Sequence, residues 1–358
     1  MRVLIAAGIY PPDAGGPAVH AKAQFEGLRE FGFDTDLVAF SHYRRWPRWI
    51  RHLFFLVALL RKALRSDLIY AHDSWGVGFP ALIAARLTGN KIVIRVGGDL
   101  AWERQAEKEN ISMNKWYENG YYRREKMFIL SRFLLRRVDA VVVIGKSLAR
   151  IYTQVYGVDG RKIKIIFNPV PETRSYEIRR EENIIFASRL TNYKNLPMLL
   201  RVFAKVLPQN QALKLTIMGD GPEMENLKRL TRELSIERDV VFTGAISLDE
   251  VLRITSECLF TIAPALTEFN PNYVLQGIGF GKPFLISREN DLPFQVPEYL
   301  MFNPMSDSEL YERIISLLNE EEYAKAGQFV KSVNFKMSWH DNLKENTDVI
   351  LSLLNGSK

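Results

Sequence analysis

Two cations five residues apart stand where an anionic ligand could bind. Arg189 and Lys194 follow the short apolar run of residues 184–187, in a half of the chain that is otherwise acidic. A guanidinium and an ammonium group placed together can neutralise a diphosphate and stabilise it as a leaving group. Exposed cations are often simply solvated, so the pair indicates a ligand site only in combination with the residues around it.

The segment of residues 264–283 carries a second group of candidates. Glu268 stands just before a helix that we expect to open near Pro271, with this proline at the first helical position. Its carboxylate would then lie beside backbone N–H groups that have no partner within the helix. Gln276 is about one and a half turns into that helix, on a face that can reach the same site.

Loops in the first half supply further candidates. Gly15 and Gly16 let the backbone pass close to a phosphate where a helix begins near Ala18, although a plain turn rich in proline and glycine has the same composition. His72 and Asp99 end the third and fourth predicted strands, at the mouth of a cleft between the two halves. Either could hydrogen-bond an acceptor hydroxyl or assist proton transfer. A strand-end aspartate is also a common helix cap.

The candidates follow strand-length apolar runs that alternate with helix-length amphipathic segments. Strands rich in Val and Ile that alternate with helices predict βαβ units and a parallel sheet buried on both faces. Ligands of such sheets bind beyond the carboxyl ends of the strands. The predicted strands are residues 3–9, 37–40, 68–71, 92–96, 140–144, 163–167, 184–187, 215–218, 240–243, 259–263 and 283–286.

The alternation is interrupted once, by residues 168–171 and the highly charged stretch after them. We interpret this interruption as an interdomain linker, because single cores stop growing near ~250 to 300 residues and the chain has 358. The prediction is an α/β protein of two doubly wound parallel-sheet domains, residues 1–170 and 171–337. A final helical segment, residues 338–358, carries Trp339 and is expected to pack back on the first domain.

Two loops of the second domain lie where a nucleotide base could be held. Gly219 follows the predicted strand at residues 215–218, in a Gly-Asp-Gly-Pro turn. Ile246 follows the predicted strand at residues 240–243. Both loops bring backbone close to the expected position of the base.

The composition is that of an ordinary globular protein, with 47% hydrophobic and 25% charged residues. A single cysteine, Cys258, excludes an internal disulfide and a thiol cluster for zinc, which favours a cytoplasmic location. The N-terminal apolar stretch lacks a cleavage pattern, so we expect a buried strand there and not a signal peptide. The longest apolar run, residues 53–60, is far shorter than the ~20 residues of a spanning helix.

Charge is distributed unevenly between the two halves. Residues 1–170 hold 27 Lys and Arg against 15 Asp and Glu, a net +12, whereas the remainder holds 21 against 26, a net −5. Residues 43–65 interleave arginines with tryptophans, and a second basic cluster spans residues 121–137. Such segments favour peripheral contact with an anionic membrane at its inner face, although residues 53–64 must also pack on the sheet.

Taken together, the motifs resemble those of the family-4 retaining glycosyltransferases over nearly the whole chain. Each motif is modest alone, but their order and spacing are specific. They are PPxxGG at residues 11–16, Asn-Pro at 168–169, Arg-Leu-x3-Lys at 189–194, GDGP at 219–222, FTG at 242–244, the Glu268 segment ending in GKP at 281–283, and Ser-Trp at 338–339.

This resemblance implies a GT-B architecture, in which two Rossmann-like domains face a cleft and the second domain binds most of the donor. Arg189 and Lys194 would hold the diphosphate of a nucleotide-sugar donor, Glu268 would contact the sugar, and backbone near Gly16 and Asn270 would help to hold phosphate. The implied reaction is hexosyl transfer by front-face substitution, without a metal or another cofactor. The acceptor would be a glycan or a lipid-linked molecule, in the synthesis of cell-surface polysaccharide or glycolipid.

Two departures from the family pattern concern the donor site. Gln276 stands where the family usually has the second glutamate of Glu-x7-Glu, which binds ribose hydroxyls, and an amide can still donate to and accept from a hydroxyl. Gly97 and Gly98 replace a His-Gly pair at the end of the fourth strand, so a histidine near the donor sugar is missing. Asp99 follows directly and would face the acceptor.

Two other functions stay open at this point. A sugar-nucleotide epimerase of the same fold would need no separate acceptor. A non-catalytic protein that binds nucleic acid or sugar nucleotides would use the basic first half, although no RRM, KH or helix-turn-helix pattern is present. For the transferase we expect a nucleotide sugar and an acceptor as partners, and no nucleic acid.

Overall fold

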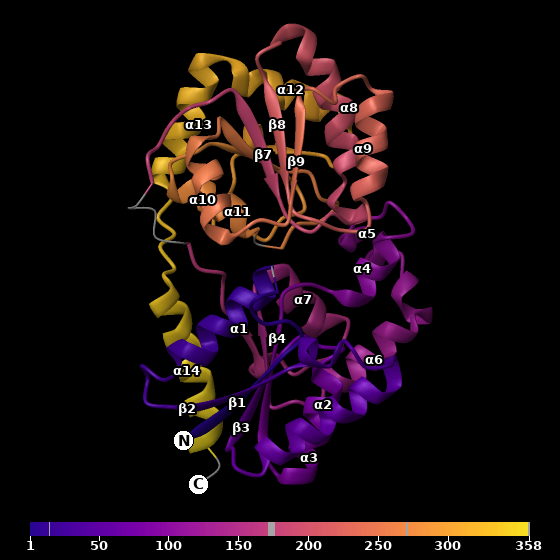
Figure 1. Ribbon diagram of the computed structural model, residues 1–358, viewed down its shortest axis with the longest axis vertical. Helices are drawn as coiled ribbons and strands as arrows, with labels where there is room; N and C mark the ends of the chain where they lie inside the picture. The colour runs from indigo at the N-terminus through magenta and orange to yellow at the C-terminus, as the bar shows by residue number, and fades with distance from the viewer. Residues whose placement is uncertain (14, 171–175, 270, 357–358) are drawn as a thin grey trace. The chain divides into compact units, whose positions relative to one another are not determined.

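The computed structural model describes residues 1–13, 15–170, 176–269 and 271–356. The chain forms two compact units (Figure 1). Unit 1 contains Met1–Glu103, Tyr117–Asn168 and Met337–Lys358, and unit 2 contains Arg104–Trp116 and Pro169–Lys336. The divisions at 168/169 and 336/337 lie within two residues of the boundaries expected from the sequence. Residues 104–116 differ from that expectation, because they group with unit 2.

Unit 1 is built on a six-stranded parallel sheet with the order β2-β1-β3-β4-β5-β6. The direction of the strand order reverses at β1, so the carboxyl ends of β1 and β3 border a topological switch point, where open α/β sheets bind ligands. The strands are β1 Arg2–Ala7, β2 Asp34–Ala39, β3 Leu68–His72, β4 Lys91–Val96, β5 Ala140–Val143 and β6 Ile163–Ile165.

Helices cover both faces of the sheet of unit 1 (Figure 1). Helices α1 and α14 lie on one face, and α2, α3 and α6 lie on the other. The helices that begin in unit 1 are α1 Gly16–Gly27, α2 Arg48–Ala63, α3 Gly78–Thr88, α4 Leu100–Ala106, α6 Lys126–Leu135, α7 Lys146–Gln154 and α14 Trp339–Asn355, with the 3-10 helices η1 Phe40–Tyr43, η2 Tyr121–Arg124 and η3 Gly160–Lys162.

The C-terminal helix α14 is part of the core of unit 1. Val349 and Ile350 pack with strand residues such as Ile5 and Val142, which are fully buried. The hydroxyl of Tyr70 donates a hydrogen bond of 2.5 Å to Oδ1 of Asn346 on this helix. Residues from the two ends of the sequence therefore stabilise a single core.

Unit 2 contains a second six-stranded parallel sheet, with the order β12-β11-β10-β7-β8-β9. Its order reverses at β7, so the carboxyl ends of β7 and β10 border its switch point. The strands are β7 Asn183–Ala187, β8 Lys214–Met218, β9 Val240–Gly244, β10 Phe260–Ala263, β11 Phe284–Ser287 and β12 Met301–Phe302. The predicted α/β class with two parallel sheets is confirmed, and β12 is an additional short strand that the sequence did not suggest.

Helices also cover the sheet of unit 2, with α8, α9 and α12 side by side and α10 beside α11 (Figure 1). No helix within the described residues is long and apolar enough to cross a bilayer. The helices that begin in unit 2 are α5 Met113–Glu118, α8 Leu196–Val206, α9 Met224–Glu233, α10 Leu248–Glu257, α11 Asn272–Gly279, α12 Asp307–Leu318 and α13 Glu320–Ser332, with η4 Asn192–Lys194, η5 Leu207–Gln209 and η6 Glu298–Leu300.

Substitution of Ile350 by alanine tests the role of α14 in the core of unit 1. Because Ile350 is fully buried, we expect I350A to lower the free energy of unfolding by about 2 to 5 kcal/mol. Urea unfolding followed by tryptophan fluorescence measures this change. The control is L64A, at a position that is 75% exposed, where we expect a change within about 0.5 kcal/mol. Equal effects of I350A and L64A would contradict the packing of α14.

Candidate active site

Lys194 and Glu268 form a buried ion pair at the switch point of unit 2. Nζ of Lys194 donates to both carboxylate oxygens of Glu268, at 2.8 and 3.0 Å. Lys194 is 8% exposed and Glu268 3% exposed. The pair forms because β7 and β10 are neighbours in the sheet, so the loops after these two strands meet at one edge.

Backbone contacts hold these two loops together. Lys194 ends η4, and the amide of Leu266 donates to the carbonyl of Tyr193 at 2.9 Å. Asn195 follows in a left-handed conformation, with a φ of 57°, and its side-chain amide donates to the carbonyls of Pro264 and Pro304 at 3.2 and 2.7 Å. Lys194 is therefore fixed on a loop with few alternative positions.

Glu289 organises the other side of the Glu268 loop. Its carbonyl accepts a hydrogen bond of 2.8 Å from the amide of Glu268, and its carboxylate accepts one of 2.9 Å from the hydroxyl of Thr267. The same carboxylate accepts from the hydroxyl of Ser112, while the amide of Met113 donates to Thr267 Oγ1 at 3.0 Å. The segment 104–116 is therefore held in unit 2 beside Glu268.

Neither Glu289 nor the segment 104–116 was found from the sequence. Glu289 follows β11 by two residues, so the rule that sites lie at the carboxyl ends of strands could have identified it. The position of residues 104–116 had no comparable signal, because it depends on hydrogen bonds between residues more than 150 positions apart.

Arg189 lies on the loop after β7 and is exposed. Within the described residues, its guanidinium forms no hydrogen bond or ion pair. The loop that carries it is tied to the loop after β8, because the amide of Ser188 donates to the carbonyl of Met218 and the amide of Leu190 to that of Asp220, both at 3.0 Å. The guanidinium is therefore available to a ligand on a backbone that is held in place.

The glycines of the GDGP turn allow the loops after β7 and β8 to approach each other closely. A Cβ atom at Gly219 would lie 2.0 Å from the carbonyl oxygen of Ser188, and one at Gly221 would lie 2.2 Å from that of Leu190. Gly219 also has a φ of 128°, which L-residues rarely adopt. The turn therefore positions the Arg189 loop, a function that the sequence had not suggested for these glycines.

The remaining candidates of unit 2 are placed as follows. Ile246 is half-buried and packs near Met218 and Cys258. Gln276 lies on α11 and is 7% exposed, and its Oε1 atom has no hydrogen-bond partner in the part of the chain that the structure describes. Asn270 lies outside the described residues. Pro271 is the N-cap residue of α11 and not its first helical residue, so that expectation was wrong by one position.

Gly15 and Gly16 in unit 1 stand at the start of α1. The helix begins at Gly16, two residues earlier than the sequence suggested, and Gly15 is its N-cap residue with a φ of 128°. Only a residue without a Cβ adopts this φ readily. The first-turn N–H groups of α1 follow the carboxyl end of β1, where an anion would be favoured.

Asp99 is completely buried and acts as the N-cap of α4. Its carboxylate accepts hydrogen bonds from the backbone amides of Ala101 and Trp102, at 3.0 and 3.1 Å, and from the hydroxyls of Tyr117 and Tyr156, at 2.6 and 2.9 Å. Burial raises the pKa of Asp99, and these hydrogen bonds act in the opposite direction. The carboxylate of Asp99 is therefore not exposed to solvent, and the helix-cap interpretation describes its contacts better than the interpretation as an acceptor-binding residue.

His72 is also buried, at the carboxyl end of β3. Its Nε2 atom has no hydrogen-bond partner among the described residues. Burial, together with the positive charge of Arg95, lowers the pKa of His72 to about 3. The imidazole is therefore neutral near pH 7 and cannot serve there as a proton donor of the imidazolium type, although it can accept a hydrogen bond.

Two family models match this chain. Residues 14–174 match Glycosyltransferase Family 4, and residues 172–331 match Glycosyl transferases group 1. The two matches follow one another along the chain and include most of both sheets. The chain therefore belongs to the group 1, family 4 glycosyltransferases, as its motifs predicted.

Individual relatives and solved structures agree with this assignment. An uncharacterized glycosyltransferase of Methanocaldococcus jannaschii is 23% identical, over 98% of this chain and 97% of the relative. Sucrose-phosphate synthase from Thermosynechococcus elongatus has a TM-score of 0.79 at 14% identity, over 99% of both chains. Anabaena HepE in complex with UDP and glucose has a TM-score of 0.73 at 14% identity, over 98% of this chain and 99% of that one. The structural likeness shows the GT-B fold.

The variant K194M tests the buried ion pair. It leaves the carboxylate of Glu268 buried without its partner, so we expect the free energy of unfolding to fall by about 3 to 5 kcal/mol. The double variant K194M/E268Q removes both charges and should recover much of this loss. K205M, on the exposed surface of α8, is the control, with a change within about 0.5 kcal/mol. Urea unfolding followed by circular dichroism measures all three. Additive effects in the double variant would contradict the pairing.

Alanine at Gly219 tests the close approach of the two loops. G219A should lower the free energy of unfolding by about 3 kcal/mol, because it adds a clash to an unfavourable φ. The matched control is G244A, which also has a positive φ, of 69°, but has no atom within 4 Å of the added Cβ. We expect G244A to cost about 1 kcal/mol. Thermal unfolding measures both variants, and a cost for G219A no larger than for G244A would refute the role of Gly219.

Proposed function

We propose that this glycosyltransferase moves a hexose from a nucleotide-diphosphate sugar to a glycan or lipid-linked acceptor, with retention of anomeric configuration. The observation that carries this proposal is the buried Lys194–Glu268 pair at the switch point of unit 2, together with the exposed Arg189 on the loop that carries Lys194. Family membership supports the same reaction class. The cell-surface polysaccharide or glycolipid pathways expected from the sequence are part of this proposal.

The charges of this site fit the donor as follows. Arg189 and Lys194 bind the diphosphate, and Lys194 exchanges one anionic partner, Glu268, for another. The carboxylate of Glu268 then accepts hydrogen bonds from sugar hydroxyls, so neither buried charge loses its partners. Two fixed cations stabilise the negative charge that develops on the leaving diphosphate, which is why we propose a reaction without a metal ion.

The transfer step follows from this charge distribution. The bond between the anomeric carbon and the diphosphate oxygen breaks while the acceptor oxygen bonds to the same face of that carbon. The proton of the acceptor hydroxyl passes to an oxygen of the leaving phosphate, so no separate general base is required. Arg189 and Lys194 act by lowering the energy of the departing anion.

Other residues would position the donor and the acceptor. Gln276 is proposed to bind the ribose hydroxyls, since its buried Oε1 atom lacks a protein partner among the described residues. Gly219 and Ile246 would supply surfaces near the base. Asp99 would act through α4, by fixing the start of that helix on the acceptor side, and His72 would accept a hydrogen bond as a neutral imidazole.

Names of related proteins support a nucleotide-sugar donor and a lipid-linked acceptor. The solved HepE complex contains UDP and glucose. The alpha-monoglucosyldiacylglycerol synthase of Streptococcus pneumoniae is 30% identical over 29% of this chain and 24% of that protein. We propose that this chain acts in the cytoplasm, in peripheral contact with the inner face of the membrane through its basic first half.

Isothermal titration with a panel of UDP-, GDP- and ADP-sugars tests donor binding. We expect one donor to bind, and R189M to raise its Kd by about 10- to 100-fold, because one charge-assisted hydrogen-bonding group is lost. R238M is the matched control, since Arg238 is exposed in the same unit and forms no ion pair within the described residues. Absence of binding at millimolar concentration of every donor would refute the proposal.

Incubation of the donor alone separates the transferase from an epimerase. An epimerase would convert the sugar without an acceptor, as nuclear magnetic resonance would show. The transferase should leave the donor intact, apart from slow hydrolysis, until an acceptor is added. The product should then keep the anomeric configuration of the donor, and an inverted product would contradict the proposed step.

A further inference from the structure

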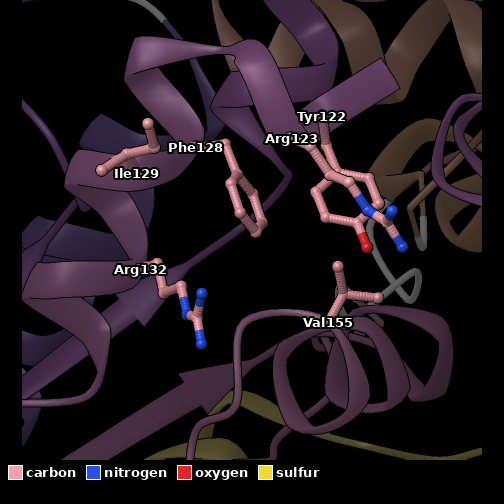
Figure 2. Close-up of a pocket in the computed structure, with 6 residues that line it drawn as sticks. All are labelled: Tyr122, Arg123, Phe128, Ile129, Arg132 and Val155. Atoms are coloured by element: carbon pink, nitrogen blue, oxygen red, sulfur yellow. The ribbon is translucent and has the colours of Figure 1, made fainter. Parts of the chain in front are cut away.

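A pocket of about 350 Å³ lies on unit 1, and most of its lining residues belong to the basic cluster of residues 121–137. Figure 2 shows its side chains around an open space, with the guanidinium groups of Arg123 and Arg132 on opposite sides. The pocket is lined by Tyr122, Arg123, Phe128, Ile129, Arg132 and Val155. These residues come from η2, from α6 and from the end of α7.

The aromatic wall of the pocket is held in place by packing. The ring of Phe128 lies 4.7 Å from that of Tyr122 and 4.6 Å from that of Tyr156, measured between ring centroids. Tyr156 is itself held by its hydrogen bond to Asp99. Nε of Arg132 donates to the carbonyl of Tyr156 at 3.1 Å, which orients its guanidinium. The pocket is therefore largely preformed.

The charge of this region is strongly positive. Residues 121–137 contain six Lys and Arg and a single acid, Glu125. Neither Arg123 nor Arg132 forms an ion pair in the part of the chain that the structure describes. Two guanidinium groups beside aromatic rings, without a carboxylate partner, fit a phosphate that is attached to a small organic group.

Exposed apolar side chains lie next to the pocket on α6. Ile129, Leu130 and Phe133 are 54%, 40% and 46% exposed, and Ile129 also lines the pocket. The guanidinium of Arg137 lies 3.6 Å from the ring centroid of Phe133. An apolar patch bordered by arginines is typical of a helix that lies at the boundary between lipid headgroups and acyl chains.

The neighbouring helices extend the same surface. Helix α3 contacts both α2 and α6, and Figure 1 shows the three helices on one side of the sheet of unit 1. Large apolar side chains on α2 and α3, and at the residue that follows α2, are also exposed: Leu53, Phe54, Leu64, Ile83 and Leu87. Helix α2 belongs to the basic segment of residues 43–65, which contains no acidic residue.

We propose that the pocket between η2, α6 and α7 binds the phosphate of an anionic phospholipid headgroup, while Ile129, Leu130 and Phe133 enter the upper acyl region. Arg123 and Arg132 bind the phosphate oxygens, and the rings of Tyr122 and Phe128 pack against the glycerol part. This inference rests on the membrane contact proposed above and assigns it to a defined site. It does not depend on the donor or on the chemical step.

Vesicle flotation with matched arginine variants tests the proposal. The probes are vesicles of phosphatidylcholine alone and vesicles that also contain phosphatidylglycerol. Wild-type protein should bind only the anionic vesicles, and R123Q should weaken binding about five- to tenfold. R136Q removes the same charge directly after α6, outside the pocket, so a clearly smaller loss is expected. Equal losses in R123Q and R136Q would overturn the pocket in favour of diffuse attraction.

Further arms identify the source of the phosphate and the role of the apolar residues. I129S should weaken binding to anionic vesicles while circular dichroism shows an unchanged fold, and unimpaired binding of I129S would overturn the insertion of α6. The wild-type protein is also tested with soluble glycerol 1-phosphate. If it binds this compound but binds neither kind of vesicle, the assignment of the pocket to a lipid headgroup is wrong. Donor titration of the wild-type protein is measured separately. Vesicle binding without donor binding would refute the transferase proposal and leave this site intact.

Discussion

The buried pair of Lys194 and Glu268 constrains the surrounding structure of unit 2, because removal of two charges from water costs several kcal/mol for each ion. Their attraction offsets that cost only while the loops after β7 and β10 stay together. The contacts of Asn195 with Pro264 and Pro304, and of Glu289 with the Glu268 loop, have this effect. A ligand that separates the pair must supply a negative group for Lys194 and donors for Glu268.

A nucleotide-diphosphate sugar meets both requirements in one molecule. In the proposed mechanism, its diphosphate replaces the carboxylate as the partner of Lys194, with Arg189 beside it, and its sugar hydroxyls donate to Glu268. The same mechanism uses these cations to bind the ground state and to stabilise the leaving group, whose charge increases as the glycosidic bond breaks. Under this proposal, binding and catalysis depend on one arrangement of side chains, which the strand order of unit 2 produces.

The sequence predicted the class of the fold well, because strand-length apolar runs and Gly-rich turns are local signals. It also identified Arg189, Lys194 and Glu268 as candidates. The pairing of Lys194 with Glu268 could not be predicted, because it depends on β10 lying beside β7 in the sheet. The environment of Asp99 also depends on tertiary contacts, because Tyr117 and Tyr156 cover its carboxylate. The position of residues 104–116 depends on tertiary contacts in the same way. The pocket of unit 1 forms where η2, α6 and the end of α7 meet, which the sequence could not predict. The sequence showed only the positive charge of this region.

A crystal structure with bound donor tests the proposed position of the diphosphate most directly. We expect density for the diphosphate within hydrogen-bonding distance of Arg189 and of Nζ of Lys194, with the carboxylate of Glu268 turned towards the sugar. A diphosphate bound elsewhere, with the Lys194–Glu268 pair intact and Arg189 in solvent, would contradict it.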